Sequence, residues 1–185
     1  MRWDALIADL SGQAEALERA ERAAEVDERS RGEFARLALL DRLRACIGTD
    51  LRLTALGGVT ISGTLRRTGR DWLLLDEGSG REAVVPSAAV LSVRANSRAA
   101  AVPESAGFVQ SRLSLRSVLR AIARDRSHVR THVVDGVVLD ATIDRVGADF
   151  LELAAHAVGE PRRQREVREF DLVPFAALAA LRRAR

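Results

Sequence analysis

Two stretches of the chain alternate apolar and polar residues with the two-residue period of half-buried strands. In the first stretch the apolar positions are Leu51, Leu53, Val59, Ile61 and Leu65. A Gly-Gly pair at 57–58 interrupts this stretch, and an Asp-Gly pair at 135–136 interrupts the second in the same way. Such pairs tolerate the positive φ angles of a tight hairpin turn. Each stretch therefore predicts a small unit of antiparallel strands.

The two stretches are copies of one another. Residues 51–75 align without a gap on residues 129–153, at a constant offset of 78. A further match, between residues 85–90 and 173–178, has an offset of 88, because ten residues are inserted between the two matches in the second copy. The proline in each further match cannot donate to a sheet ladder, so it predicts the end of a strand, one helical turn and a last strand. The chain is therefore a tandem repeat of two five-stranded units.

The third predicted strand has one face that differs between the copies. Trp72 and Leu74 in the first copy stand where the second copy has Phe150 and Glu152. A large apolar face is normally removed from water. We therefore expect that something covers this face in the first copy and covers less of it in the second.

Apolar residues at three- and four-residue spacing predict an amphipathic helix of about 25 residues near the N-terminus. Its apolar positions are Trp3, Leu6, Leu10, Leu17, Ala20 and Ala24. The run Ser30-Arg31-Gly32-Glu33 matches a capping box, which predicts that a second helix begins there and ends before Gly48. Two arrangements remain open. The helices form either a hairpin lying on the Trp72 face or a coiled-coil arm through which two chains dimerise.

One predicted helix, just ahead of the second copy, carries an arginine every four residues: Arg112, Arg116, Arg120 and Arg124. Leucine, valine and isoleucine occupy the opposite side of this helix, so its apolar face should pack inward and its arginines outward. A second basic surface is offered by the inserted loop, with Arg162, Arg163, Arg165 and Arg168, together with the tail, with Arg182, Arg183 and Arg185. Guanidinium groups suit contacts with nucleic-acid phosphates. The alternative is that the arginines form a solvent-exposed face whose positive charge complements the acidic N-terminal helix.

The pattern of each copy resembles that of a known family. Five short strands with a helical turn before the last are typical of small SH3-like and Sm-like barrels. Residues 57–75, in which a glycine-bent second strand leads to Asp71 before the third, resemble the first Sm motif of Sm and Hfq-like proteins. Residues 84–93 resemble a divergent form of the last two strands. The resemblance covers over half of the chain and implies a barrel of this kind in each copy.

The nucleotide pocket of that family does not carry over. Leu73 and Leu74 stand where the family has an asparagine, and Ser87 or Phe175 stands near the position of its basic-glycine pair. No residue here is therefore assigned to a uridine pocket.

Asp71 and Asp149 match the aspartate of the family motif. The resemblance implies that this aspartate holds its turn by accepting hydrogen bonds from backbone amides.

These patterns together predict an α+β protein. Two tandem five-stranded Sm- or SH3-like small β-barrels are expected to follow an N-terminal helical hairpin or coiled-coil arm. The expected divisions are a helical segment (1–48), the first barrel (49–95), a linker (96–111), and a basic helix with the second barrel (112–185).

Composition narrows the class of protein. The chain is 47% hydrophobic and 30% charged, and no apolar run approaches the roughly 18 residues that indicate a membrane span. The single cysteine, Cys46, excludes an intrachain disulfide and is typical of a reducing compartment. The N-terminus lacks the pattern of a signal peptide. We therefore expect a cytoplasmic protein with no membrane partner.

No motif predicts catalysis or a cofactor. His128 and His132 have the spacing of helical metal ligands, but on the predicted strand they would lie about 13 Å apart. The Gly-Gly pair at 57–58 precedes a strand rather than a helix, unlike the glycines of a phosphate loop. We expect a non-enzymatic protein with no catalytic residue, no metal and no cofactor.

Two functions remain open. The first is a regulator that associates with RNA or DNA through its arginine-rich surfaces and contacts the backbone more than the bases. The net charge of +3 is too small to decide this by itself. The second is a protein-interaction adaptor or scaffold that uses barrel edges and the N-terminal helices, with Trp3, Phe34 and Trp72 as partner contacts. Homo-oligomerisation stays open under both.

Overall fold

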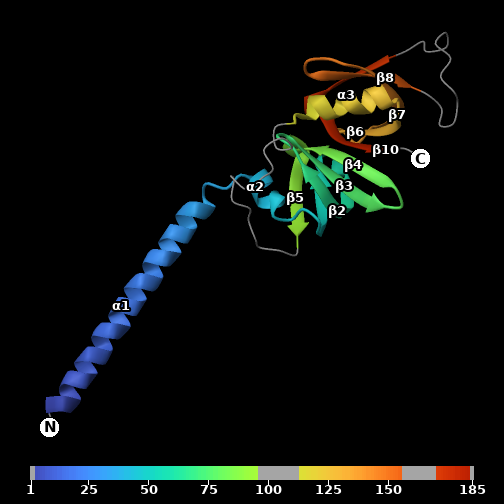
Figure 1. Ribbon diagram of the computed structural model, residues 1–185. Helices are drawn as coiled ribbons and strands as arrows, with labels where there is room; N and C mark the ends of the chain where they lie inside the picture. Colours follow the sequence, from blue (N-terminus) through green and yellow to red (C-terminus); the bar gives the residue numbers. More distant parts are fainter. Residues whose placement is uncertain (1–2, 96–112, 156–169, 184–185) are drawn as a thin grey trace. The chain divides into compact units, whose positions relative to one another are not determined.

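The computed structural model describes residues 3–95, 113–155 and 170–183 (Figure 1). The chain divides into two units, one ending at Ala38 and the other beginning at Leu39. The predicted linker, 96–111, lies outside the described residues.

The first unit contains one long helix, α1 (Trp3–Phe34). The capping-box residues Ser30 and Glu33 lie inside it, because the amide of Ala35 still donates to the carbonyl of Arg31 at 3.0 Å. An ion pair one turn apart, Arg29 to Glu25 at 2.7 Å, supports the last turns by about 0.3–0.5 kcal/mol. The predicted helix start at Ser30 is therefore wrong.

No second helix packs on α1 within the described part of this unit. The large apolar side chains of α1 whose surroundings are described are all exposed: Trp3, Leu17, Val26 and Phe34. Charged residues lie between these positions in the sequence, so no closed apolar seam is formed. The predicted helical hairpin and the predicted coiled-coil arm are both wrong.

The second unit opens with a short helix, α2 (Leu39–Arg44), and contains two repeats. The strands of the first repeat are β1 (Asp50–Ala55), β2 (Thr60–Thr68), β3 (Trp72–Gly78), β4 (Arg81–Pro86) and β5 (Val90–Ala95). Helix α3 (Leu115–Asp125) leads into the second repeat, whose strands are β6 (His128–Val133), β7 (Val138–Val146), β8 (Phe150–Ala155), β9 (Phe170–Pro174) and β10 (Leu178–Arg183). A short 3₁₀ turn precedes the last strand of each repeat, as predicted, in η2 (Ser87–Ala89) and η5 (Phe175–Ala177). A further 3₁₀ turn, η1 (Leu56–Gly58), joins β1 to β2.

The strand pairing confirms the internal repeat. Leu53 lies opposite Ile61 between β1 and β2, and the residues 78 positions later, Thr131 and Leu139, lie opposite each other between β6 and β7. The register shift between β2 and β3 also recurs at the matching position between β7 and β8. The same sequence pattern therefore specifies the same strand register twice.

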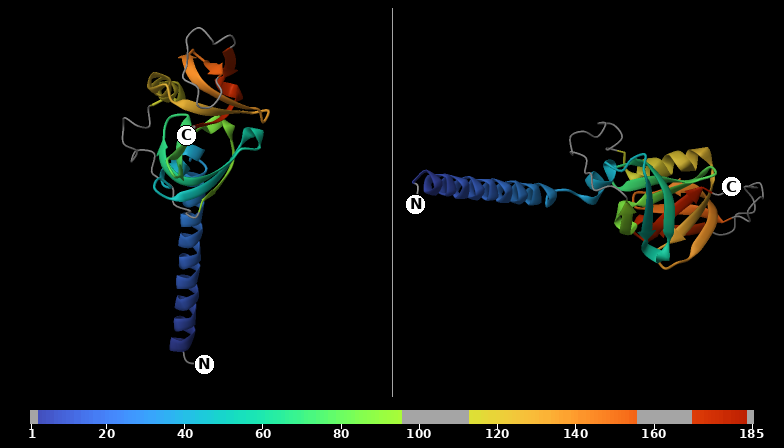
Figure 2. Two further views of the ribbon diagram at one scale, coloured as in Figure 1. Left: turned by 90° about the vertical axis from the view of Figure 1, so that its right-hand side faces the viewer. Right: turned by 90° about the horizontal axis from the view of Figure 1, so that it is seen from below.

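The strands form one open antiparallel sheet, in the order β5-β1-β2-β3-β4-β10-β6-β7-β8-β9. Figure 2 shows how strongly this sheet curves. Within the first repeat β5 pairs with β1, but β4 does not close onto β5, because its outer side pairs with β10 of the other repeat. The prediction of two separate closed barrels, and the Sm-like or SH3-like assignment based on it, is therefore wrong. The protein is mostly β-sheet, with few helices.

The hydrophobic cores interlock across the β4–β10 junction. One cluster joins Leu53 of the first repeat, and Cys46 just before β1, to Ala179 and Ala180 of β10. The other joins Trp72 of the first repeat to side chains of α3 and the second repeat. Each repeat therefore contributes side chains to the hydrophobic core of the other, as expected for units too small to bury enough surface alone.

Candidate functional site

The start of α3 is anchored on the first repeat. The indole nitrogen of Trp72 donates to the carbonyl of Leu113 at 2.8 Å, and the amide of Leu115 donates to the Asp71 carboxylate at 2.6 Å. The indole ring lies over Gly69, where a Cβ atom would overlap it. The element that covers the Trp72 face is therefore α3 with the residues just before it, rather than the N-terminal helices.

This anchor changes the predicted roles of two residues. Trp72 is buried and cannot act as a surface contact for a partner. Asp71 binds the amide of a residue 44 positions away rather than an amide of its own turn. Trp3 and Phe34, the other predicted partner contacts, are exposed on α1.

Replacing Asp71 with alanine is expected to lower the free energy of unfolding by about 1 kcal/mol, the usual cost of losing a side-chain acceptor at a helix start. Urea denaturation followed by circular dichroism measures this change. Asp149→Ala is the matched control, because within the described residues the Asp149 side chain accepts no hydrogen bond. Equal losses in the two variants would contradict the anchoring role of Asp71.

A second polar cluster holds β10 to the first repeat. The Arg182 guanidinium donates to both carboxylate oxygens of Glu77, at 2.9 and 3.0 Å, and to the carbonyl of Thr60 at 2.8 Å. Its Nη1 lies 3.2 Å from Nε2 of His132. The Arg182 and Glu77 side chains are 25% and 13% exposed, so this ion pair is screened less than a surface pair.

The folded protein disfavours the protonated form of the His132 imidazole at this junction. Burial lowers the pKa of His132, and the positive charges of Arg182 and Arg130 lower it further, against smaller opposing effects of Glu77 and Asp140. In the unfolded chain the pKa of His132 is near 6.5. Just below this pH the unfolded chain binds a proton at His132 and the folded chain does not. The contribution of His132 to folding is therefore lost as the pH falls below about 6.5.

We expect the free energy of unfolding to fall between pH 7 and pH 5, and His132→Gln to reduce that fall. Glutamine cannot take up the proton that favours unfolding in the wild type. Denaturant titrations at a series of pH values measure the slope. An identical slope in His132→Gln and wild type would contradict this prediction.

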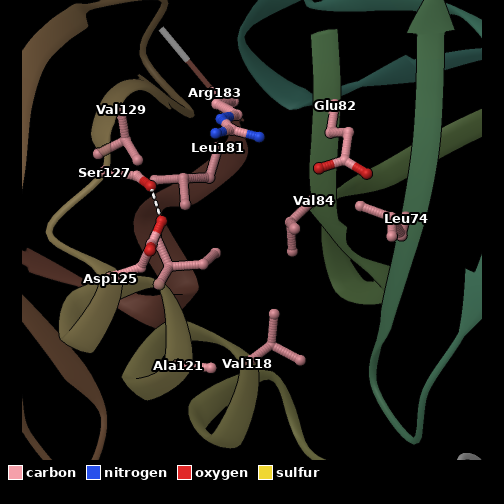
Figure 3. Close-up of a pocket in the computed structure, with 11 residues that line it drawn as sticks. Leu74, Glu82, Val84, Val118, Ala121, Asp125, Ser127, Val129, Leu181 and Arg183 are labelled. Carbon is pink, nitrogen blue, oxygen red and sulfur yellow. Dashed lines mark hydrogen bonds between the residues drawn. The ribbon is translucent and has the colours of Figure 1, made fainter. Parts of the chain in front are cut away.

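An apolar pocket of about 280 Å³ lies between α3 and the sheet at the junction of the repeats (Figure 3). Val118 of α3 faces Val84 and Leu74 of the first repeat, while Glu82 and Arg183 lie at the polar side. The hydroxyl of Ser127 donates to Asp125, so these two polar groups already satisfy each other. The pocket thus offers apolar contact but few polar groups to orient a ligand.

Only part of the predicted arginine stripe is described. Nε of Arg116 donates to the carbonyl of Gly147 at 2.9 Å, so Arg116 is engaged in packing α3 on the second repeat. Arg120 and Arg124 are exposed and line a shallow groove with Arg145 of β7, which the sequence pattern did not single out, and with Asp144. Of the predicted tail arginines, Arg182 is paired with Glu77 and Arg183 is exposed. The remaining predicted contacts lie outside the described residues: Arg112, Arg162, Arg163, Arg165, Arg168 and Arg185. The described residues give no evidence for nucleic-acid binding.

The described side chains form no group of three or more histidine, cysteine, aspartate or glutamate residues that could hold a metal ion. His128 and His132 lie at separate positions of β6. No helix in the described segments is long and apolar enough to cross a membrane.

The two open edges of the sheet expose large apolar side chains. Leu91 on β5 is 61% exposed, and on β9 Phe170 is 48% and Leu172 is 65% exposed. Sequence reasoning missed these residues because their two-residue alternation looks like that of any strand. Their exposure could be recognised only once the pairing of β4 with β10 showed which strands are left at the edges.

No protein-family model matches the sequence, and no curated protein matches it. The assignment to Sm and Hfq-like proteins therefore has no support from family comparison either.

Proposed function

We propose that this chain is a non-enzymatic interaction protein that binds protein partners by strand addition at the open edges of its sheet, β5 and β9. The observation that carries the proposal is the exposure of Leu91 and Leu172 on these edges, at 61% and 65%. Strands at the edge of a sheet present unpaired N–H and C=O groups that pair readily with another strand.

Natural edge strands are commonly protected by charged side chains, proline or a covering element. β9 carries Asp171 and Pro174 and β5 carries Arg94, yet Phe170 and Leu172 of β9 and Leu91 of β5 remain exposed. These edges leave apolar side chains in contact with water. A partner strand that covers them buries apolar area, which stabilises the complex by about 25 cal/mol per Å². This balance favours a bound edge over a free one.

The cytoplasm is the compartment in which we expect this binding. The one cysteine of the chain, Cys46, is a buried thiol in the first core cluster. Unpaired thiols of this kind are typical of proteins in a reducing compartment.

Site-specific photo-crosslinking in living cells tests the proposal. A photoreactive phenylalanine analogue is placed at Leu91, at Leu172 or, as a control, at Val137. Val137 is 48% exposed in the turn between β6 and β7, away from both edges. Protein adducts are expected from the two edge positions and few from Val137. If the edge positions give no more adduct than Val137, strand addition at these edges is excluded.

A further inference from the structure

We propose that the partner at these edges is a second copy of this chain, with β9 of one molecule pairing antiparallel with β5 of the next. This inference rests on the proposed function, because it names the occupant of the same edges. Its support comes from the repeat, which places at the two open edges the same two kinds of strand that pair inside the molecule.

Strand β4 of the first repeat corresponds to β9 of the second, and β5 corresponds to β10. Inside the molecule β4 pairs with β10 and joins the repeats. The strands left at the outer edges are β9 and β5, which are the counterparts of that pair. One edge of the sheet is therefore β9, the counterpart of β4, and the other edge is β5, the counterpart of β10. A second copy can continue the sheet by pairing its β5 with β9.

Burial differs sharply between the internal junction and its counterparts at the open edges. Val84 of β4 is 6% exposed, whereas the equivalent Leu172 of β9 is 65% exposed. Ala179 of β10 is fully buried at 0%, whereas the equivalent Leu91 of β5 is 61% exposed. The edges thus carry apolar residues at the positions where the junction buries them, and a second copy would bury them in the same way.

The internal register predicts the register between molecules. At the junction Leu181 lies opposite Val84 and Arg182 lies opposite Ala83. Transferred by the repeat offset of 88, the first pair becomes Val93 opposite Leu172. The second becomes Arg94 opposite Asp171, in which an alanine is replaced by a carboxylate facing a guanidinium. Cross-strand pairs of opposite charge stabilise a sheet, and like charges oppose pairing.

The Arg94–Asp171 pair takes the place of a contact that the open edges lack, namely the Arg182 clamp of the internal junction. Arg182 binds Glu77 and the carbonyl of Thr60 across the internal junction. The residue equivalent to Arg182 is Arg94, but the residue 78 positions after Glu77 is Ala155, which has no carboxylate. Asp171 supplies the missing acceptor from the neighbouring strand. Arg94 and Asp171 are both exposed in the single chain, as two halves of an intermolecular pair should be.

Contacts of this kind are head to tail, because two different edges meet. Repetition of one such contact gives a closed ring when the rotation between copies closes and an open filament when it does not. In either product every interior molecule has both edges paired. This removes the exposed edge strands that a lone chain presents.

Charge reversal of the predicted pair tests the proposal on the purified full-length chain. Sedimentation velocity is measured over an about hundredfold range of concentration for wild type, Asp171→Arg, Arg94→Asp and the double variant. Wild type is expected to exceed the monomer mass of 20.1 kDa as concentration rises. Each single reversal places like charges together and is expected to raise the half-assembly concentration at least about tenfold. The double variant restores opposite charges and is expected to recover assembly.

Arg120→Asp is the matched control, since it reverses an exposed charge on α3 away from both edges and should leave assembly unchanged. A wild type that stays at 20.1 kDa throughout overturns the proposal, as does an assembly that ignores both single reversals or is not recovered in the double variant. Crosslinks from Leu91 and Leu172 to another protein, with a monomeric wild type, overturn self-assembly and leave the proposed function standing. Absence of edge-specific crosslinks in cells overturns the proposed function as well.

Discussion

Replacing Trp72 with alanine is expected to lower the free energy of unfolding by about 3–5 kcal/mol, the usual cost of removing a buried aromatic side chain. Trp72 is 4% exposed and belongs to the core cluster that includes Leu119 of α3. Its indole nitrogen also donates to the carbonyl of Leu113. The substitution therefore opens a cavity and removes the hydrogen bond that holds the residues before α3. Urea denaturation at a low protein concentration measures the loss.

The matched control is Phe150→Ala, at the equivalent position of the second repeat. Phe150 is only half-buried, so the loss is expected to be smaller, at about 1–2 kcal/mol. Because Gly147 accommodates the Phe150 ring as Gly69 accommodates that of Trp72, the two sites differ mainly in what covers them. Equal losses would contradict the conclusion that α3 and the residues before it seal the first repeat.

Replacing Arg182 with alanine is expected to cost about 2–3 kcal/mol. Loss of the guanidinium leaves the Glu77 carboxylate, 13% exposed, without its cation. Leaving a partly buried charge without its partner lowers the free energy of unfolding by about this amount. The carbonyl of Thr60 also loses its donor. Urea denaturation measures the change.

Arg94→Ala is the control for Arg182→Ala, because it removes the equivalent arginine at the open edge. In the single chain Arg94 forms no ion pair with a described residue, so the free energy of unfolding measured at low concentration should change by less than about 0.5 kcal/mol. If Arg94→Ala destabilised the chain as much as Arg182→Ala, the β4–β10 junction would not depend on the Arg182 clamp.

Local sequence pattern was sufficient to predict the strands of each repeat, but not the closed barrel expected of them. Alternation at Leu51 and Leu53, together with the glycines of the turns, predicted the strands, and the structure adds that both copies share one register. The difference between Trp72 and Phe150 predicted that one face would be covered more fully. These features depend on neighbours in the sequence, which a pattern of apolar and polar residues records.

Long-range pairing was not predictable in the same way. Because β5 and β10 are copies of one strand type, the apolar–polar alternation of β4 does not distinguish pairing with β5 from pairing with β10. The capping-box pattern at Ser30 was misleading for a related reason, because a helix that is already formed incorporates such residues without a break. The exposed edge residues were therefore visible only once the order of the ten strands was known.

Hydrogen exchange of the full-length chain at low and high concentration tests the central claim most directly, namely that β5 and β9 are the two halves of one intermolecular strand pair. The backbone amides of residues 90–95 and 170–173 that point away from β1 and β8 are expected to exchange fast in dilute protein and more slowly in concentrated protein. Amides of β4 and β10 should exchange slowly at both concentrations, because that pair is internal. Fast exchange of both edges at every concentration would contradict the account.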